Sequence, residues 1–339
     1  MPIKKQEHLP TLSYFCACKF TANKASCRIK LANLQTMYDN DSKGISYIAG
    51  FFMLIAFVIA GMMFTQVITG PIWTGLTGKN ISVLRDGLMA PEDATAVKLI
   101  QSLSAILGFL LPTLVTAFLL HRRPMKLLGF EARNMQAKQL GVVILIIGTA
   151  LFVSSSLSYL THLIPISPSS KEFFDRLEEN YNKQVSIIID LKTVGDYILA
   201  LVIMALLPAF CEEVLFRSGF QNFLTRGTDN PWLAIIVVST LFSVMHLSYY
   251  GFLSRLSLGI VLGALYYYSG TIWWSILAHF IYNALAITTL YVYTLQGKPL
   301  MEAMDEKVEN FWGILALLPL IGLFIIFKNA TAKNRRRLA

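Results

Sequence analysis

Two adjacent carboxylates and an arginine interrupt a run of aliphatic residues. Glu212, Glu213 and Arg217 lie within Leu201–Arg226, a stretch that begins as a membrane helix would. A charge at bilayer depth is costly, so ionisable residues there indicate a functional site. Because Glu213 and Arg217 are four residues apart, they share a helix face and are expected to form an ion pair. Glu212 points about 100° away, and a free carboxylate in a low-dielectric site can act as a general base.

Two of the five histidines lie within other apolar stretches. His246 follows Phe242 by four residues, and Asn283 follows His279 by four. Each pair therefore shares one face of a helix. An imidazole can move a proton or donate a hydrogen bond, and an amide can donate one. We expect these side chains to face the carboxylates.

The depth of Glu212 and His246 follows from residue counting. Glu212 lies 17 residues before Asp229, and His246 lies 17 residues after it. An antiparallel hairpin that turns at Asp229 brings both to one depth, roughly 25 Å along each helix. A single buried histidine is more often a core residue, and a Glu–Arg pair can simply hold helices together. Polar groups that meet in depth on three helices are better explained by a functional cavity within the membrane.

Three short motifs carry a resemblance to a known family. EEVLFR (Glu212–Arg217), FSVMH (Phe242–His246) and HFIYN (His279–Asn283) resemble the EExxxR, FxxxH and HxxxN/D motifs of the CAAX protease and bacteriocin-processing family. They occur in the family's order across Val194–Leu295, whereas the N-terminal half carries no motif. The resemblance implies an intramembrane endopeptidase.

The resemblance also implies roles for these residues. Glu212 with His246 would activate a water for attack on the scissile carbonyl. His279 and Asn283 would donate hydrogen bonds to the developing oxyanion, which is worth several kcal/mol in a water-excluded site. The supporting residues would be Glu213, Arg217 and Phe242.

A metal is the alternative for the same side chains. Glu212, His246 and His279 could bind zinc and leave one position open. The chain has no HExxH sequence, and asparagine is a poor zinc ligand. We therefore favour a glutamate mechanism without a metal, and we expect no cofactor.

Composition sets the class of protein. Hydrophobic residues make up 55% of the 339 residues and charged residues 14%, against about a quarter charged in soluble domains. Mean hydropathy is +0.56, as in polytopic membrane proteins. The net charge of +9 comes from bases beside apolar runs, which follows the positive-inside rule and does not indicate nucleic-acid binding. Cys16, Cys18 and Cys27 in the tail, with Cys211, form no disulfide framework.

Apolar runs predict the helices. A membrane helix needs about 20 apolar residues, and eight stretches approach that length. The fold is therefore predicted to be all-α, a polytopic bundle of about eight transmembrane helices, with Pro112 kinking the second. A capping box at Ser169 and Glu172 predicts an amphipathic helix on the outer face. The predicted spans are Ser46–Val67, Leu99–Leu120, Leu140–Leu163, Val194–Leu224, Trp232–Leu247, Leu253–Tyr268, Thr271–Leu295 and Phe311–Phe327.

Loop charges predict the orientation. The basic loop 121–139 and the turn 225–231 are placed in the cytoplasm, and the acid-rich loops 164–192 and 296–310 outside. Both termini are then cytoplasmic. Residues 1–36 are interpreted as a disordered tail or a mis-assigned start. The predicted divisions are a polar tail (1–45), accessory helices (46–193), a catalytic segment (194–295), and a last helix with its outer loop and basic tail (296–339).

The expected partners are the lipid bilayer and a peptide or membrane-protein substrate, reached from the cytoplasmic side of a bacterial inner membrane. The sequence does not indicate an oligomeric state. Two alternatives use the same polar cluster. A proton-coupled transporter would relay protons through it, although no inverted repeat is visible. A non-catalytic membrane scaffold would use the cluster for stability alone.

Overall fold

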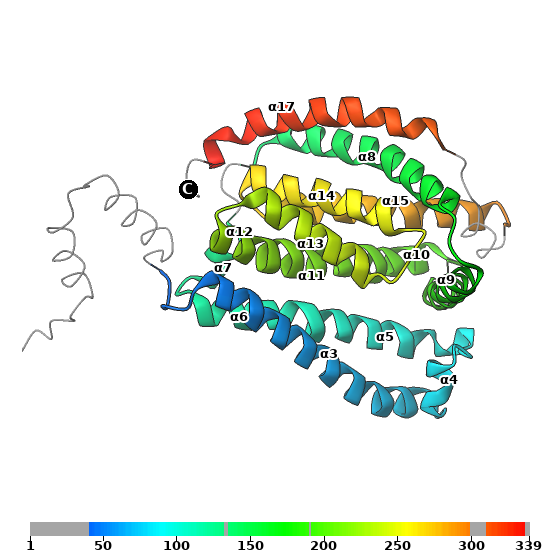
Figure 1. The fold of residues 1–339 in the computed structure, drawn as a ribbon. Coiled ribbons are helices and arrows are strands. Elements are labelled where there is room, and N and C mark those ends of the chain that lie inside the picture. Colours follow the sequence, from blue (N-terminus) through cyan, green and yellow to red (C-terminus); the bar gives the residue numbers. More distant parts are fainter. Residues whose placement is uncertain (1–40, 132–134, 190, 299–309, 336–339) are drawn as a thin grey trace, which may run out of the picture.

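The computed structural model describes residues 41–131, 135–189, 191–298 and 310–335. These residues form helices without a named strand, and one isolated bridge pairs Ser42 with His121 (Figure 1). Six helices among them are long and apolar enough to cross a membrane. The predicted all-α membrane architecture is confirmed for this part of the chain. The count of eight is not, because α13 (Pro231–Met245) is shorter and α14 (Phe252–Ser269) is not among the six.

The first two spans are longer than predicted. Helix α3 (Tyr47–Thr77) runs ten residues past the predicted end and ends at Gly78, whose φ of 68° suits a glycine. The residues after Val67 are therefore helical as far as Thr77, and Trp73 explains why, because it is buried against Ala96 and Val97 of the second span. The second span runs continuously from Pro91 to Leu120. It comprises η1 (Pro91–Asp93), α5 (Ala94–Ala105), η2 (Ile106–Leu110) and α6 (Leu111–Leu120).

A π-helical stretch stands beside the predicted kink. The five residues of η2 directly precede α6, in which Pro112 lies near the start. Proline lacks the N–H that an α-helix needs in its interior, so the wider turn before it accommodates the missing bond. Between the two spans lies the short helix α4 (Ile81–Arg85), and α7 (Pro124–Leu127) follows the second.

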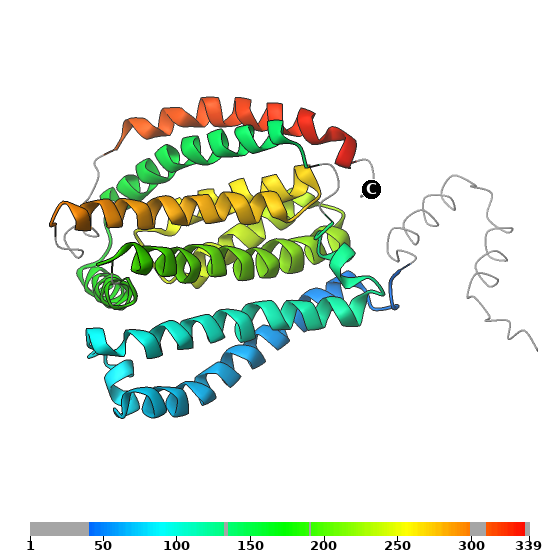
Figure 2. The same ribbon diagram turned by 180° about the vertical axis from the view of Figure 1, so that it is seen from behind.

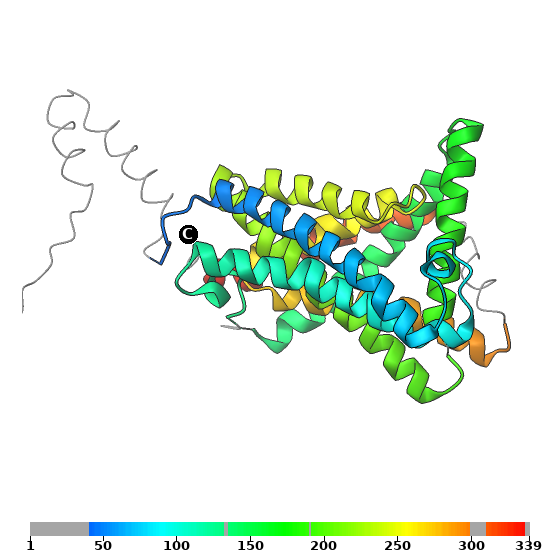
Figure 3. The same ribbon diagram turned by 90° about the horizontal axis from the view of Figure 1, so that it is seen from below.

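The predicted amphipathic helix is present. Helix α8 (Ala137–Leu163) forms the third span, and α9 (Pro168–Ile188) follows it. Helix α9 lies across one end of the bundle (Figure 3). Its N-cap is Ser167, which accepts from the backbone N–H of Ser170. The predicted capping box at Ser169 was therefore wrong, because Pro168 already occupies the first helical turn.

The fourth span begins where predicted and ends four residues later. It runs as one helix over Val194–Thr228, so the predicted turn from Thr225 was wrong. Asp229, with a φ of 52°, makes the reversal, and its short polar side chain tolerates that conformation. The hairpin partner α13 then packs closely on α14. A Cβ added at Gly259 would lie 2.8 Å from Ser239 Cβ, so the absence of a side chain at Gly259 allows the two helices to approach closely.

The helices form three layers. Helices α8 and α17 (Leu317–Arg335) lie on one side, and α3 with α5–α6 on the other (Figure 1). Between them lie the 194–228 helix, α13, α14 and α15 (Trp273–Leu295), and α15 runs beside the 194–228 helix (Figure 2). The short η5 (Trp312–Ala316) precedes α17. The predicted tail up to residue 40, with its three cysteines, and most of the 296–310 loop lie outside the described residues.

Candidate active site

The motif-bearing helix is regular only in part. Its central segment α11 (Leu207–Glu213) is α-helical and lies between two π-helical stretches. Pro208 in the first turn of α11 explains the first stretch, because it cannot donate to the preceding turn. π-helical turns rotate the side chains that follow and often occur at functional sites. The other segments are α10 (Val194–Ala200), η3 (Leu201–Leu206), η4 (Val214–Gln221) and α12 (Asn222–Thr228).

Glu213 is the buried centre of a network. Its Oε2 lies 3.2 Å from Arg217 Nε, so the predicted ion pair is present. Its Oε1 lies 2.9 Å from His279 Nδ1. Arg217 also donates from Nη2 to the Gly259 carbonyl at 3.2 Å. One carboxylate thus ties α11, η4 and α15 together, with Arg217 extending the network to α14.

Glu212 has a different environment from its neighbour. Its side chain is 17% exposed, whereas that of Glu213 is fully buried. Glu212 Oε2 lies 4.0 Å from His279 Nε2. The two nitrogens of His279 therefore face two different carboxylates, one bonded to it and one across a gap. This confirms the prediction that one glutamate is paired and the other faces elsewhere.

Phe242 connects the two histidines. Its ring packs against His246, with centroids 4.7 Å apart, and edge-on against His279 at 5.9 Å. The Arg217 guanidinium lies 5.0 Å from the centroid of the same ring, which is a cation–π distance. Among the described residues no hydrogen bond or ion pair joins His246 to Glu212. Instead, His246 caps the end of α13, is exposed, and bonds through Nδ1 to the Phe242 carbonyl at 2.7 Å.

Asn283 lies near His279 but makes no hydrogen bond to it. It lies one helical turn beyond His279 on α15 and is half-buried, and its amide makes no hydrogen bond within the described residues. The same part of the chain contains no group of three His, Cys, Asp or Glu side chains that could hold a metal ion. Glu212, His246 and His279 do not form such a group in this structure.

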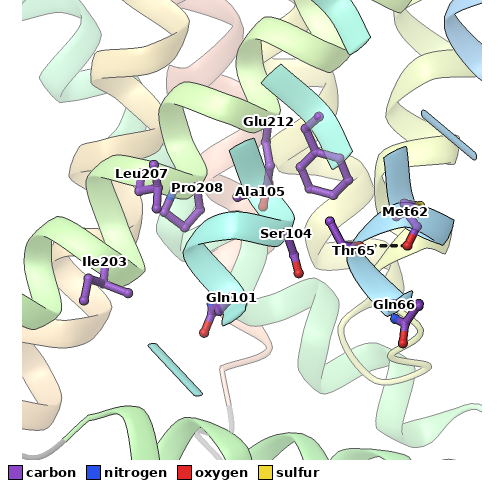
Figure 4. Close-up of a pocket in the computed structure, with 11 residues that line it drawn as sticks. Met62, Thr65, Gln66, Gln101, Ser104, Ala105, Ile203, Leu207, Pro208 and Glu212 are labelled. Carbon is purple, nitrogen blue, oxygen red and sulfur yellow. Dashed lines mark hydrogen bonds between the residues drawn. The ribbon is translucent and has the colours of Figure 1, made fainter. Parts of the chain in front are cut away.

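A cavity of about 310 Å³ adjoins Glu212. Figure 4 shows Glu212 at one end of the lining residues and Gln101 and Gln66 farther away. The two glutamines, with Ser104, come from α3 and α5, which were predicted to be accessory helices. Sequence reasoning missed these residues because no motif marks them. The available signal was the presence of amide and hydroxyl side chains inside apolar spans. The lining is Met62, Thr65, Gln66, Gln101, Ser104, Ala105, Phe109, Ile203, Leu207, Pro208 and Glu212.

Comparison with known proteins bears on this segment. The family model described as type II CAAX prenyl endopeptidase Rce1-like matches residues 194–285, about a quarter of the chain. The match contains all three motifs and confirms the predicted resemblance over that segment. No curated protein and no solved structure matches the chain.

Proposed function

Because residues 194–285 match the type II CAAX prenyl endopeptidase Rce1-like family, we propose that this membrane protein is an intramembrane endopeptidase. The observation that carries the proposal is the division between the two glutamates. Glu213 holds Arg217 and His279, and Glu212 faces the cavity opposite the other nitrogen of His279. An ion pair that only held helices together would not need the second carboxylate.

Glu212 is proposed as the general base. The 4.0 Å between Glu212 Oε2 and His279 Nε2 is too long for a hydrogen bond, yet one water oxygen can bind both atoms. Glu212 takes a proton from that water, and the oxygen attacks the scissile carbonyl carbon. The proton then passes to the leaving nitrogen as the peptide bond breaks. His246, which faces the same aromatic ring as His279, assists in orienting the water.

His279 and Asn283 are proposed as oxyanion donors. Because Glu213 accepts the proton on Nδ1 of His279, only Nε2 can reach the substrate oxygen. The ring donates from Nε2 when it carries both protons. The Asn283 amide lies one turn farther along the helix on the same face. Donors held in place before the reaction stabilise the charge that develops on that oxygen.

The substrate proposed is a peptide or a segment of a membrane protein in a bacterial inner membrane. Glutamate chemistry explains the residues without a metal. Incubation of the purified protein with a chelator, followed by a cleavage assay and metal analysis, tests that point. Full activity in metal-free protein is the expected result, and activity restored only by added zinc would contradict it.

Comparison of Glu212→Gln with wild type tests the function. Cells expressing each variant are compared by mapping new protein termini in the membrane fraction. We expect at least one terminus to disappear in Glu212→Gln, with membrane insertion and thermal stability unchanged. Glu179→Gln is the matched control, because Glu179 is exposed on α9 and pairs with Lys183. Identical termini in Glu212→Gln and wild type, or Glu212-dependent proton flux in proteoliposomes, would contradict the proposal.

A further inference from the structure

The cavity extends from Glu212 toward only one end of the bundle. We call this the α9 end, where α4, α9 and the connection from α13 to α14 lie, and the opposite one the α7 end, where α7 and the turn after α12 lie (Figures 1 and 3). Leu207 and Ile203 precede Glu212 on a helix that starts at the α9 end. Gln101 lies in the half of its span that starts there too. Gln66 lies past the middle of α3, whose C-terminus reaches that end.

The opposite direction is closed by packing. All eight residues of η4 are buried, and Phe216, Phe220 and Phe223 form a core cluster with the first residues of α3 and the end of α6. Two hydrogen bonds to backbone carbonyls at the α7 end add to this packing. Ser218 donates to the Leu128 carbonyl at 2.6 Å and Asn222 to the Leu127 carbonyl at 2.7 Å. No cavity lining residue comes from this half of the helix.

His246 lies at the α9 end as well. It is exposed, and the loop that follows it is held by α9. Tyr250 donates to Asp175 Oδ1 at 2.6 Å, and Ser248 donates to Glu178 Oε2 at 2.9 Å. Burial and the hydrogen bond to Asp175 raise the pKa of Tyr250 to about 12, so its hydroxyl stays protonated and donating. His246 is therefore at the end of the bundle toward which the cavity extends, although it is not one of the residues that line the cavity.

Charge distinguishes the two ends. The segment 121–139 beside the closed end carries five bases and one acid, and Arg122, Arg123 and Lys126 are exposed. Helix α9 carries four acids and three bases. An excess of Lys and Arg in short loops marks the cytoplasmic side of a membrane protein. The closed end is therefore the cytoplasmic one by this rule, and the α9 end faces away from the cytoplasm.

We propose that the site takes its substrate from the non-cytoplasmic side, and that the substrate is an extended segment of an exported peptide or of a membrane protein exposed there. This rests on the proposed function for the reaction, and on the cavity and the loop charges for the side. The amides of Gln66 and Gln101 and the hydroxyl of Ser104 can each pair with a peptide N–H or C=O. Access from the cytoplasm, expected from the sequence, would have to cross the buried η4 segment.

Cysteine labelling tests the side of access. The parent protein has Cys16, Cys18 and Cys27 replaced by serine and keeps Cys211, which is buried and sets the background. Gln101→Cys reports on the cavity, and Ser218→Cys, of nearly unchanged size, reports on the closed half. Each variant reacts with a charged, membrane-impermeant methanethiosulfonate reagent, added to intact spheroplasts or to inverted membrane vesicles.

Two exposed positions mark the sides, Glu179→Cys on α9 and Lys126→Cys on α7. We expect Gln101→Cys and Glu179→Cys to label in spheroplasts, Lys126→Cys to label in inverted vesicles, and Ser218→Cys to stay at background in both. Labelling of Gln101→Cys together with Lys126→Cys would overturn the proposal. So would labelling of Lys126→Cys in spheroplasts, or no labelling of Gln101→Cys where both markers react.

The labelling result does not depend on catalysis. Gln101→Cys combined with Glu212→Gln is expected to label as Gln101→Cys does alone. If labelling is as expected but Glu212→Gln changes no terminus in the membrane fraction, the proposed protease function fails and the side of access stands. If termini change but labelling occurs from the cytoplasmic side, the reverse holds.

Discussion

From Glu213 to Phe223 the long central helix is buried at every residue, whereas most residues between Leu201 and Glu212 are only partly buried or exposed. The two halves are continuous in sequence, and the more polar one is the buried one, since it carries Glu213, Arg217, Ser218, Gln221 and Asn222. They differ in their neighbours. In the buried half, η4 packs against α3, α6 and α13, and its Ser218 and Gln221 donate to the carbonyls of Leu128, directly after α7, and of Gly263 on α14. In the other half, residues of the helix line a cavity together with residues of α3 and α5.

The boundary between the halves falls between the two glutamates. Glu213 forms ion pairs with Arg217 and His279 in the closed half, while Glu212 lines the cavity in the open half. A buried charge is stable only when it is paired and hydrogen-bonded. Two successive residues of one helix therefore have different roles: Glu213 stabilises the packed half, and Glu212 lies at the accessible cavity. Substitutions in the closed half should reduce stability, and substitutions in the open half should reduce activity.

Arg217→Met should have the largest effect on stability. The substitution leaves the Glu213 carboxylate fully buried without its ion-pair partner, and breaking a buried pair in this way costs about 3–5 kcal/mol. The free energy of unfolding, measured by SDS titration in mixed micelles, should fall by that amount. The double variant Glu213→Gln/Arg217→Met should lose less, because no charge is left unpaired. A loss no larger than that of Lys126→Met on the surface would show that the pair is not structural.

Asn222→Leu tests the closure at the α7 end. The buried Asn222 amide donates to the Leu127 carbonyl at 2.7 Å, so the substitution leaves a buried acceptor unsatisfied, at a cost of about 1–3 kcal/mol. The same SDS titration measures the loss. The cleavage rate per folded molecule should remain that of wild type, because Asn222 is more than two helical turns from Glu212. A rate that falls while stability is unchanged would contradict the division between the halves.

Helical spacing predicted the pairing of Glu213 with Arg217 but did not predict the cavity. Glu212, Glu213, Arg217 and His279 could be placed because helical spacing of 3.6 residues per turn fixes which side chains share a face. The ion pair to Arg217 followed from that rule. The bond from Glu213 to His279 did not, because two π-helical stretches change the rotation of the helix, and spacing alone does not indicate where such turns occur.

Helix ends were predicted poorly where packing decided them. Trp73 extends α3 because it is buried beside Ala96 and Val97. This contact joins two spans, so it cannot be predicted from the hydropathy of either span alone. The cavity was missed for a related reason. Gln66 and Gln101 lie in different spans, and only the way α3 and α5 pack places their amides at the same cavity as Glu212.

Gln101→Leu is expected to have the smallest effect, a modest loss of kcat/KM, and it tests whether the open half contacts the substrate. Gln101 lines the cavity and its amide lies 3.6 Å from Met204 Sδ, a weak contact that substrate can replace. Loss of one hydrogen bond to the substrate backbone is worth about 1 kcal/mol, which is about fivefold in kcat/KM. The change should appear mainly in KM, with stability unchanged, once a cleaved peptide has been identified from the mapped termini. Gln296→Leu, at the exposed C-cap of α15, is the matched control. If both variants lower kcat/KM equally, or if Gln101→Leu destabilises the protein as Asn222→Leu does, the open half is a packed core and the proposed route for substrate is wrong.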